Sequence, residues 1–306
     1  MHRPVLYHEI IHALRPQRGG RFVDCTVGAG GHAQGILRES SPDGLLLGLD
    51  VDPAALDLAA ERLAEFGQRA YLVRGSYSSL RDQITALGWK DVDGIVMDLG
   101  VSSMQLDTPE RGFSFQIDAP LDMRFDPDSS PSAADLVNRL PEAELAEIIY
   151  KLSDEKRARQ VARAIVINRP LTTTGQLATI IANTTRGGRP GFHPATRTFQ
   201  ALRIAVNREL ETLERALPAA VAALAPGGRL AVIAFHSIED RIVKHYFRQE
   251  SQDCLCPPRQ PVCTCGHKAT IRVLTQKPIR PQPEEVDQNP RARSARLRIA
   301  EKLAPG

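Results

Sequence analysis

The chain has 306 residues, of which 42% are hydrophobic and 25% charged, and its formal net charge is +3. These values are ordinary for a soluble globular protein and argue against disorder. No apolar run approaches the roughly 20 residues of a membrane span. Glu9 interrupts the N-terminal stretch where a signal peptide needs an apolar core. We therefore expect a cytoplasmic protein with no membrane association.

The first hundred residues alternate short apolar runs with helical patterns. The runs at residues 22–25, 45–50, 71–73 and 95–98 are nearly continuous, which predicts strands buried on both faces. Residues 53–66 follow an N-capping Asp and begin with Pro, as a helix does. Alternating strands and helices predict βαβ units and a doubly wound α/β sheet.

The alternation stops after about residue 110. Residues 111–131 are rich in Pro, Asp and Ser, as long loops are, and the chain then shows only helical patterns as far as Leu217. An all-helical block inside an α/β chain indicates an inserted subdomain. We predict an α/β domain formed by residues 1–110 and 218–306, and a helical subdomain formed by residues 111–217.

The α/β pattern returns near the C-terminus. A strand is expected at residues 228–235, followed by a helix that begins at Ser237 with Asp240 as its capping-box partner. Residues 271–274 and 296–299 are candidates for closing strands. From Lys268 to the end there are nine Lys or Arg and four Asp or Glu. Such a tail fits either a polyanionic partner or a solvated end of the chain.

A glycine-rich turn follows the first predicted strand and opens a helix. Gly28, Gly30 and Ala33 satisfy the loose dinucleotide fingerprint Gly-x-Gly-x-x-Gly/Ala, in which backbone N–H groups lie close to a ligand. Asp50, at the end of the second strand, can bind both hydroxyls of an adenosine ribose. Sites for NAD and for S-adenosylmethionine share both features.

Asp24, which precedes the glycines, distinguishes the two cofactors. Its carboxylate would repel a pyrophosphate, whereas it suits the cationic sulfonium and amino-acid end of S-adenosylmethionine. Asp98 ends the fourth strand, so acids end strands one, two and four at the ligand-binding edge of the sheet. This pattern favours a methyltransferase over an NAD-dependent oxidoreductase.

Eight motifs in order along nearly the whole chain carry a family resemblance. They lie at residues 2–9, 24–32 (Asp-x-Thr-x-Gly-x-Gly-Gly-His), 98–107 (Asp-Leu-Gly-Val-Ser-Ser-x-Gln-Leu-Asp), 111–115, 121–124, 199–203, 235–241 and 289–294. The chain is thus similar to the bacterial 16S ribosomal RNA (cytosine-N4)-methyltransferase family. The resemblance implies a Rossmann-like class I methyltransferase fold.

The resemblance also implies a set of cofactor-binding residues for S-adenosylmethionine. They are Gly30, Gly31, His32, Asp50, Asp98 and Gln105, with Tyr77 against the adenine. Other members commonly have Phe at the Tyr77 position. The ring face is kept, so stacking should survive.

The implied reaction is methyl transfer to the exocyclic N4 of a decoding-centre cytosine in 16S rRNA of the small ribosomal subunit. The N4 lone pair is delocalised into the ring, so we expect catalysis by in-line placement and by an acceptor for the N–H proton. Asp98 is the candidate catalytic residue, together with backbone carbonyls of Leu99 and Gly100. Related amino-methyltransferases have prolines at this turn, which this chain lacks.

The target base must leave its RNA context to be methylated. We expect the loop 102–131 and the helical insertion to face RNA, with the tail arginines adding to them. The basic residues of the insertion are Lys156, Arg157, Arg159, Arg163, Arg186, Arg189 and Arg197. A non-catalytic RNA-binding module is the alternative, against which the three intact acids argue. The oligomeric state is left open, with a homodimer as one option.

Two further motifs resemble metal sites. His8-Glu9-x-x-His12 matches a zinc-peptidase motif but has no obvious third ligand, so we interpret it as a solvated helix face. The cluster Cys254-x-Cys256-(x6)-Cys263-x-Cys265 is interpreted as reduced thiols in a surface loop. Structural zinc, with His267 as a substitute ligand, is the alternative. No metal is assigned to the active site.

Overall fold

The computed structural model describes residues 4–185, 193–257, 260 and 262–304. The chain forms two compact units. Residues Met1–Gly100 and Glu211–Gly306 form the first, here called the sheet unit, and Val101–Leu210 form the second, called the helical unit. No helix among the described residues is long and apolar enough to cross a membrane.

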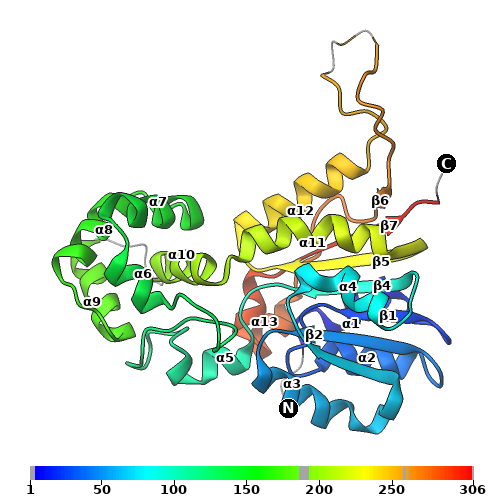
Figure 1. The fold of residues 1–306 in the computed structure, drawn as a ribbon, viewed down its shortest axis with the longest axis horizontal. Helices are drawn as coiled ribbons and strands as arrows, with labels where there is room; N and C mark the ends of the chain where they lie inside the picture. Colours follow the sequence, from blue (N-terminus) through cyan, green and yellow to red (C-terminus); the bar gives the residue numbers. More distant parts are fainter. Residues whose placement is uncertain (1–3, 186–192, 258–259, 261, 305–306) are drawn as a thin grey trace. The chain divides into compact units, whose positions relative to one another are not determined.

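The sheet unit contains one seven-stranded sheet in the order β3-β2-β1-β4-β5-β7-β6 (Figure 1). Its strands are β1 (Arg21–Asp24), β2 (Leu45–Asp50), β3 (Ala70–Arg74), β4 (Val92–Asp98), β5 (Leu224–Ala234), β6 (Ile271–Val273) and β7 (Arg296–Lys302). Every strand expected from the sequence is present, which confirms the α/β prediction. The neighbouring pairs among β1 to β5 are parallel, whereas β7 runs antiparallel to β5 and β6.

The strand order reverses at β1, whose two neighbours are β2 and β4. Sheets of this kind bind ligands outside the carboxyl ends of the strands at such a reversal. Asp24, the last residue of β1, lies opposite Gly48 of β2 and Val96 of β4. The topology therefore locates the candidate site at the carboxyl ends of β1, β2 and β4.

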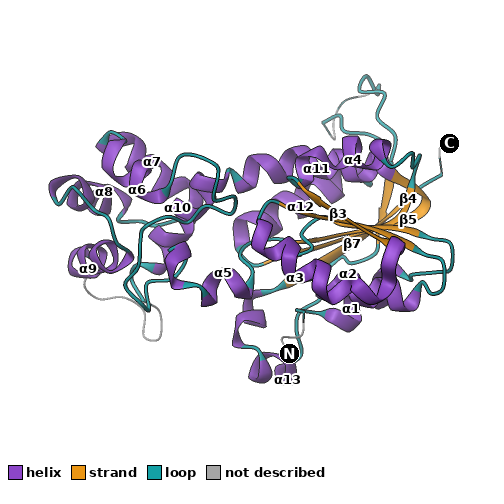
Figure 2. Cartoon of the chain, turned by 60° about the horizontal axis from the view of Figure 1, so that its bottom comes forward, coloured by secondary structure: helices purple, strands orange, loops and turns teal. Residues whose placement is uncertain are grey.

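Helices cover both faces of this sheet, as Figure 2 shows. One face packs against α4 (Leu80–Ala86), α11 (Glu209–Ala223) and α12 (Ser237–Glu250), around the fully buried Leu47, Ile95 and Leu230. The other packs against α1 (Tyr7–Leu14), α2 (Gly31–Glu39) and α3 (Pro53–Leu63), around Phe22 and Val96. The strands are buried on both sides, which explains their continuous apolar sequences.

Shorter helices complete the sheet unit. They are η1 (Ala64–Arg69), η2 (Tyr77–Ser79), α13 (Pro283–Gln288) and η4 (Pro290–Ser294). The expected helix at residues 53–66 is α3, and the Asp52 carboxylate accepts a hydrogen bond from the Ala54 N–H at 3.1 Å, as an N-cap does. The kink at Gly67, whose φ is 55°, lies inside η1.

The helical unit has its own hydrophobic core. Its helices are α5 (Ser103–Asp107), η3 (Pro109–Arg111), α6 (Ala133–Arg139), α7 (Glu142–Ser153), α8 (Ala158–Ile167), α9 (Thr174–Thr184) and α10 (Thr196–Asn207). Within its described part the only β-pairing is an isolated bridge between Pro120 and Thr173. The unit begins at Val101, ahead of the expected boundary at residue 111, because Val101 and Leu106 pack against its core.

Candidate active site

Three carboxylates end three neighbouring strands of the sheet. Asp24 ends β1, Asp50 ends β2 and Asp98 ends β4. Asp24 is 1% exposed, and the side chain of Asp98 is 25% exposed. The prediction that acids gather at the carboxyl edge is confirmed.

The loop after β1 is hydrogen-bonded to all three of these residues. The Thr26 N–H donates to Oδ1 of Asp24 at 3.2 Å, and the Thr26 hydroxyl accepts from the Asp98 N–H at 2.7 Å. The Gly28 N–H donates to Oδ2 of Asp50 at 2.9 Å. Sequence patterns alone assign Thr26 no role. In the structure, the Thr26 hydroxyl binds the backbone N–H of Asp98 on β4, 72 residues away, and this bond positions Asp98.

Two glycines give the turn a backbone that other residues adopt with strain. Gly28 has φ of 50°, and Gly30, the N-cap of α2, has φ of 76°. Gly31 is required for a different reason, because a Cβ on it would lie 2.2 Å from Cγ of Pro4. A Cβ on Gly28 would meet only the Thr26 carbonyl oxygen, at 3.8 Å, so the backbone at Gly28 is open to close approach by a ligand.

His32 lies in the first turn of α2 and is 4% exposed. Its Nε2 is 3.7 Å from Oδ2 of Asp98, too far for a direct hydrogen bond but close enough for electrostatic attraction. Its ring stacks on Tyr7 with centroids 6.4 Å apart and an interplanar angle of 14°. This packing fixes the orientation of the imidazole beside Asp98.

Several buried polar atoms at this edge have no hydrogen-bond partner among the described residues. They are Oδ2 of Asp24, Oδ1 of Asp98, and both ring nitrogens of His32. A buried polar atom without a partner costs about 1–3 kcal/mol, so such atoms are rare in folded proteins. Their concentration at the predicted cofactor loop indicates a site built for a polar ligand.

Burial dominates the electrostatics of the site. It raises the pKa of Asp24 from 3.8 to about 7, against the attraction of His32 and the hydrogen bond from Thr26, and Asp98 and Asp50 raise it further. Burial also raises the pKa of Asp50, although backbone N–H groups of Asp52 and Gly28 oppose this. A cationic ligand would relieve this concentration of negative charge.

Tyr77 begins η2, shortly after β3, and Ser76 caps that turn with a 3.2 Å hydrogen bond from the Ser78 N–H. The Tyr77 side chain packs against the core shared with α4. Asp50 ends β2 and Tyr77 follows the adjacent parallel strand β3, so both lie at the carboxyl edge of the sheet. This placement is compatible with the expected adenosine end of the site.

Gln105 lies in the helical unit, in α5, where it forms a capping box with Ser102. Its Oε1 accepts from the Ser102 N–H at 3.0 Å, and the residue is 5% exposed. The structure therefore shows a helix-capping role for Gln105. Its expected contact with the cofactor stays a prediction.

A second network follows β5. The helix α12 is capped by His236, one residue earlier than predicted, because Glu239 completes the capping box by accepting N–H bonds from Phe235 and His236. Asp240 is instead held by Arg298 at 2.7 Å and by Arg296 at 3.3 Å. The expected pairing of Ser237 with Asp240 is therefore wrong.

The two motifs that resemble metal sites differ in the structure. His8 and His12 are both exposed on α1, in agreement with the solvated-face interpretation. Among the described residues, one group of three or more side chains could hold a metal ion, and it consists of Cys254, Cys256, Cys263 and Cys265. His267 does not belong to that group.

The carboxyl edge fits S-adenosylmethionine in three respects. A buried acid with an unpartnered oxygen suits a cation, the glycine turn allows close backbone approach, and Asp50 retains lone pairs beyond its two backbone bonds. A pyrophosphate would be repelled by ionised acids at this edge. Fold and site together define a Rossmann-like, S-adenosylmethionine-dependent methyltransferase.

Comparison with known proteins gives the family. A model described as the MraW methylase family matches residues 1–303. Proteins named "Ribosomal RNA small subunit methyltransferase H" are similar to this chain: that of Trichlorobacter lovleyi is 52% identical over 99% of this chain and 98% of its own length. That of Thermomicrobium roseum is 50% identical over 99% and 94%. The chain belongs to the MraW methylase family and is a methyltransferase.

Solved structures resemble the chain more distantly. A putative rRNA methylase from Clostridium thermocellum aligns with a TM-score of 0.46 at 12% identity, covering 99% of this chain and 100% of the other. A putative methyltransferase from Streptococcus mutans in complex with SAH aligns with a TM-score of 0.44 at 11% identity, covering 99% and 100%.

Proposed function

We propose that this methyltransferase transfers the methyl group of S-adenosylmethionine to N4 of a decoding-centre cytosine in 16S rRNA. The observation that carries the proposal is the roughly half identity, over nearly the whole chain, to proteins named for methylation of small-subunit ribosomal RNA. The sequence resemblance supplies the cytosine and its N4 position. The substrate would be met in the small ribosomal subunit, and thus in the cytoplasm.

The cofactor, when bound, supplies an electrophilic methyl group on a positively charged sulfur. Asp24 would provide a negative charge beside that sulfur, and the Asp50 carboxylate would accept hydrogen bonds from the ribose hydroxyls. The backbone of Gly30 and Gly31, together with His32, lines the loop side. Tyr77 stacks against the adenine, and Gln105 contributes from α5.

Asp98 is the proton acceptor in this proposal. Its main chain is held by Thr26, and its Oδ1 has no partner among the described residues. N4 of cytosine is a weak nucleophile, so accepting its N–H proton lowers the barrier. In the balanced reaction the nitrogen–carbon bond forms, the carbon–sulfur bond breaks and S-adenosylhomocysteine leaves. The following turn is fixed, since the Leu99 N–H donates to the Ile233 carbonyl at 3.0 Å. Its carbonyl groups can orient the amino group.

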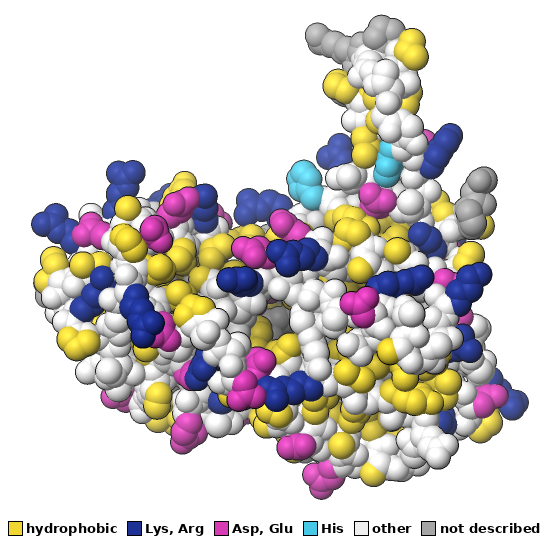
Figure 3. Space-filling model, in the orientation of Figure 1, with side chains coloured by type: hydrophobic (Ala, Val, Ile, Leu, Met, Phe, Trp, Pro, Cys, Tyr) yellow, Lys and Arg dark blue, Asp and Glu magenta, His cyan; other side chains and the backbone are white. Residues whose placement is uncertain are grey.

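The RNA-facing surface is proposed on the helical unit. Lys156, Arg157, Arg159 and Arg163 are exposed at and before α8, and Arg197 is exposed but lies 3.8 Å from a Glu155 oxygen. Figure 3 shows basic and acidic side chains intermixed over this unit, so its charge is not of one sign. Arg186 and Arg189, which were expected to take part, lie outside the described residues.

The tail contributes less than its sequence predicts. Arg298 is 6% exposed and is paired with Asp240, so it is not available to phosphates. Arg296 is paired with the same carboxylate at 3.3 Å, and its side chain is 30% exposed. Arg291 and Arg293 are exposed. The expectation that the tail arginines add to the RNA-facing surface is therefore wrong for Arg298, because the Asp240 carboxylate binds it where it is buried.

Deletion of the gene tests the assignment. Nucleoside mass spectrometry of 16S rRNA from the deletion strain should show loss of N4-methylcytidine, restored by the wild-type gene and not by Asp98→Asn. Asp93→Asn is the matched control, since Asp93 lies near the start of the same strand, where its Oδ2 accepts from the Arg21 N–H at 2.7 Å. It should restore the modification. Unchanged N4-methylcytidine in the deletion strain would refute the proposal.

A further inference from the structure

The described part of the segment between α12 and β6, within residues 251–270, lacks a hydrophobic core. Its described residues extend away from the sheet (Figure 1), and none of them is buried. The base of the segment is fixed, because the Thr270 N–H donates to the Glu250 carbonyl at 2.8 Å and the Ala269 N–H donates to Asp253 at 3.2 Å. Beyond that base, burial of apolar side chains does not explain how the segment holds together.

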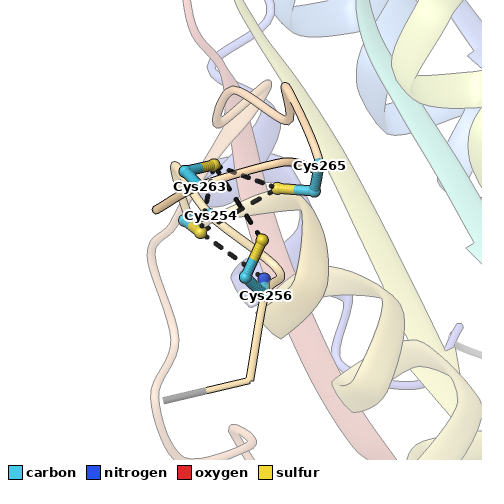
Figure 4. A group of neighbouring side chains, drawn as sticks. All are labelled: Cys254, Cys256, Cys263 and Cys265. Atoms are coloured by element: carbon cyan, nitrogen blue, oxygen red, sulfur yellow. Dashed lines mark hydrogen bonds between the residues drawn. The ribbon is translucent and has the colours of Figure 1, made fainter. Parts of the chain in front are cut away.

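The four cysteines of this segment meet at one point, as Figure 4 shows. Their Sγ atoms all lie within 4.8 Å of one another. The separations are 3.5 Å for Cys254–Cys263, 3.6 Å for Cys263–Cys265, 3.9 Å for Cys254–Cys265 and 4.0 Å for Cys256–Cys263. Two cysteines come from each arm of the segment, one pair before and one pair after its tip.

These separations are those of thiolates around a single ion. A zinc–sulfur bond of about 2.3 Å in a tetrahedron places the sulfurs about 3.8 Å apart. A disulfide would require about 2.05 Å, and Cys263 lies at similar distances from three possible partners, which favours no one pairing. A cluster of several irons would need the sulfurs further apart.

Backbone N–H groups point at the sulfurs. Leu255 donates to Sγ of Cys265 at 3.3 Å, Cys256 to Sγ of Cys254 at 3.4 Å, and Thr264 to Sγ of Cys256 at 3.4 Å. Donors of this kind orient metal ligands and offset the charge of thiolates. The ligand atoms are thus organised by the chain itself and do not merely happen to be near each other.

We propose that Cys254, Cys256, Cys263 and Cys265 bind one structural Zn²⁺ ion. Tetrahedral four-sulfur sites select zinc among ions that need no redox chemistry. Four protein ligands leave no open position, so the ion is structural, and binding releases the thiol protons to solvent. In place of a core, the ion joins the chain at Cys254 and Cys256 to the chain at Cys263 and Cys265. This site is separate from the proposed methyl-transfer chemistry and does not depend on it.

The zinc content of the full-length protein tests the proposal. Protein purified in reducing buffer, loaded with Zn²⁺ and dialysed, should hold about one zinc per chain by elemental mass spectrometry. The double variant Cys254→Ser/Cys263→Ser should hold none. Cys25→Ala, which removes the buried fifth cysteine, and His267→Ala, which removes the nearby imidazole, should keep it. A wild type without zinc, or a double variant that retains it, overturns the proposal.

Two further readouts address geometry and folding. Replacement of zinc by Co²⁺ should give the intense sulfur-to-metal absorption and the visible bands of a tetrahedral four-thiolate site. Proteolytic cleavage within residues 251–270 should be faster in the double variant than in the wild type. The melting temperature of the protein should be the same for both. Disulfides between these cysteines in the freshly reduced, metal-loaded protein would contradict the proposal.

Discussion

Replacing Asp24 with asparagine removes a buried carboxyl group that can ionise, while keeping the shape of the side chain. The acid is 1% exposed, and burial raises its pKa from 3.8 to about 7. In the unfolded chain the group releases its proton near its ordinary pKa, whereas in the cofactor-free folded chain it retains the proton up to about pH 7. The preference of the folded state for the protonated carboxyl group therefore adds to the free energy of unfolding. This contribution is fully present below about pH 4 and is lost as the pH rises through about 7.

The magnitude follows from that window. Between pH 5 and the folded pKa of about 7, each pH unit lowers the stability by about 1.36 kcal/mol, which gives about 3 kcal/mol in total. The Asp24→Asn variant would have no such dependence. The amide itself has a cost, because it would put a donor where Oδ2 has no partner, but that cost is independent of pH.

Urea unfolding of both proteins at pH 5 and pH 8, without cofactor, measures the effect. The quantity of interest is the difference in free energy of unfolding between variant and wild type, compared between the two pH values. The stability of Asp24→Asn relative to the wild type should increase by about 3 kcal/mol from pH 5 to pH 8. A change near zero would refute the reasoning, because it would mean that burial does not hold the proton on Asp24.

The same variant tests the cofactor site. Asp24→Asn should bind S-adenosylmethionine at least about tenfold more weakly at pH 8, as expected when a charge near a cation is lost. The loss for S-adenosylhomocysteine, whose sulfur is neutral, should be smaller. Isothermal titration calorimetry measures both, with Asp93→Asn as the control that leaves both affinities unchanged. Equal losses for the two ligands would contradict placement of the charge near the sulfonium.

Three further changes probe the framework of the site. Thr26→Val removes the acceptor for the Asp98 N–H, so it should lower the free energy of unfolding in urea by about 1–3 kcal/mol and lower the methylation rate. Thr26→Ser should restore both. Full activity of the valine variant would show that this bond does not position Asp98. Gly31→Ala places a Cβ 2.2 Å from Pro4 and should destabilise the protein by about 1–3 kcal/mol, whereas an unchanged melting temperature would mean that the N-terminal segment moves freely. Arg298→Met leaves Asp240 with Arg296 alone and should cost about 3 kcal/mol at pH 7. Burial alone would raise the pKa of Asp240, but Arg298 and Arg296 lower it. The loss of stability in Arg298→Met should therefore shrink as the pH falls below about 4. A loss of stability that is independent of pH would exclude the ion pair as its cause.

The sequence predicts the sheet well because buried parallel strands have a distinctive composition. The expected run at residues 45–50 is β2, and the acids Asp24, Asp50 and Asp98 end their strands as expected. The strand order and the antiparallel direction of β7 were not predicted. They depend on pairing between segments far apart in the chain, which a local apolar pattern does not encode.

The parts of the site that the sequence did not reveal all depend on contacts across the fold. The hydroxyl of Thr26 has a role only because β4 lies beside β1, and His32 is oriented by Tyr7 from another helix. Likewise, the pairing of Arg298 with Asp240 could not be distinguished from a basic tail that binds phosphates. The sequence also left open whether the four clustered cysteines are reduced thiols or metal ligands, because spacing along the chain does not show how closely their sulfur atoms approach one another.

The central claim is tested most directly by the position of the transferred methyl group. The purified protein is incubated with small ribosomal subunits from a deletion strain and S-adenosylmethionine labelled in the methyl group. The 16S rRNA is then digested to nucleosides for mass spectrometry. We expect label in N4-methylcytidine, and none when Asp98→Asn replaces the wild type. Label in 5-methylcytidine, in a ribose-methylated nucleoside, or in no nucleoside of the wild-type reaction would contradict it.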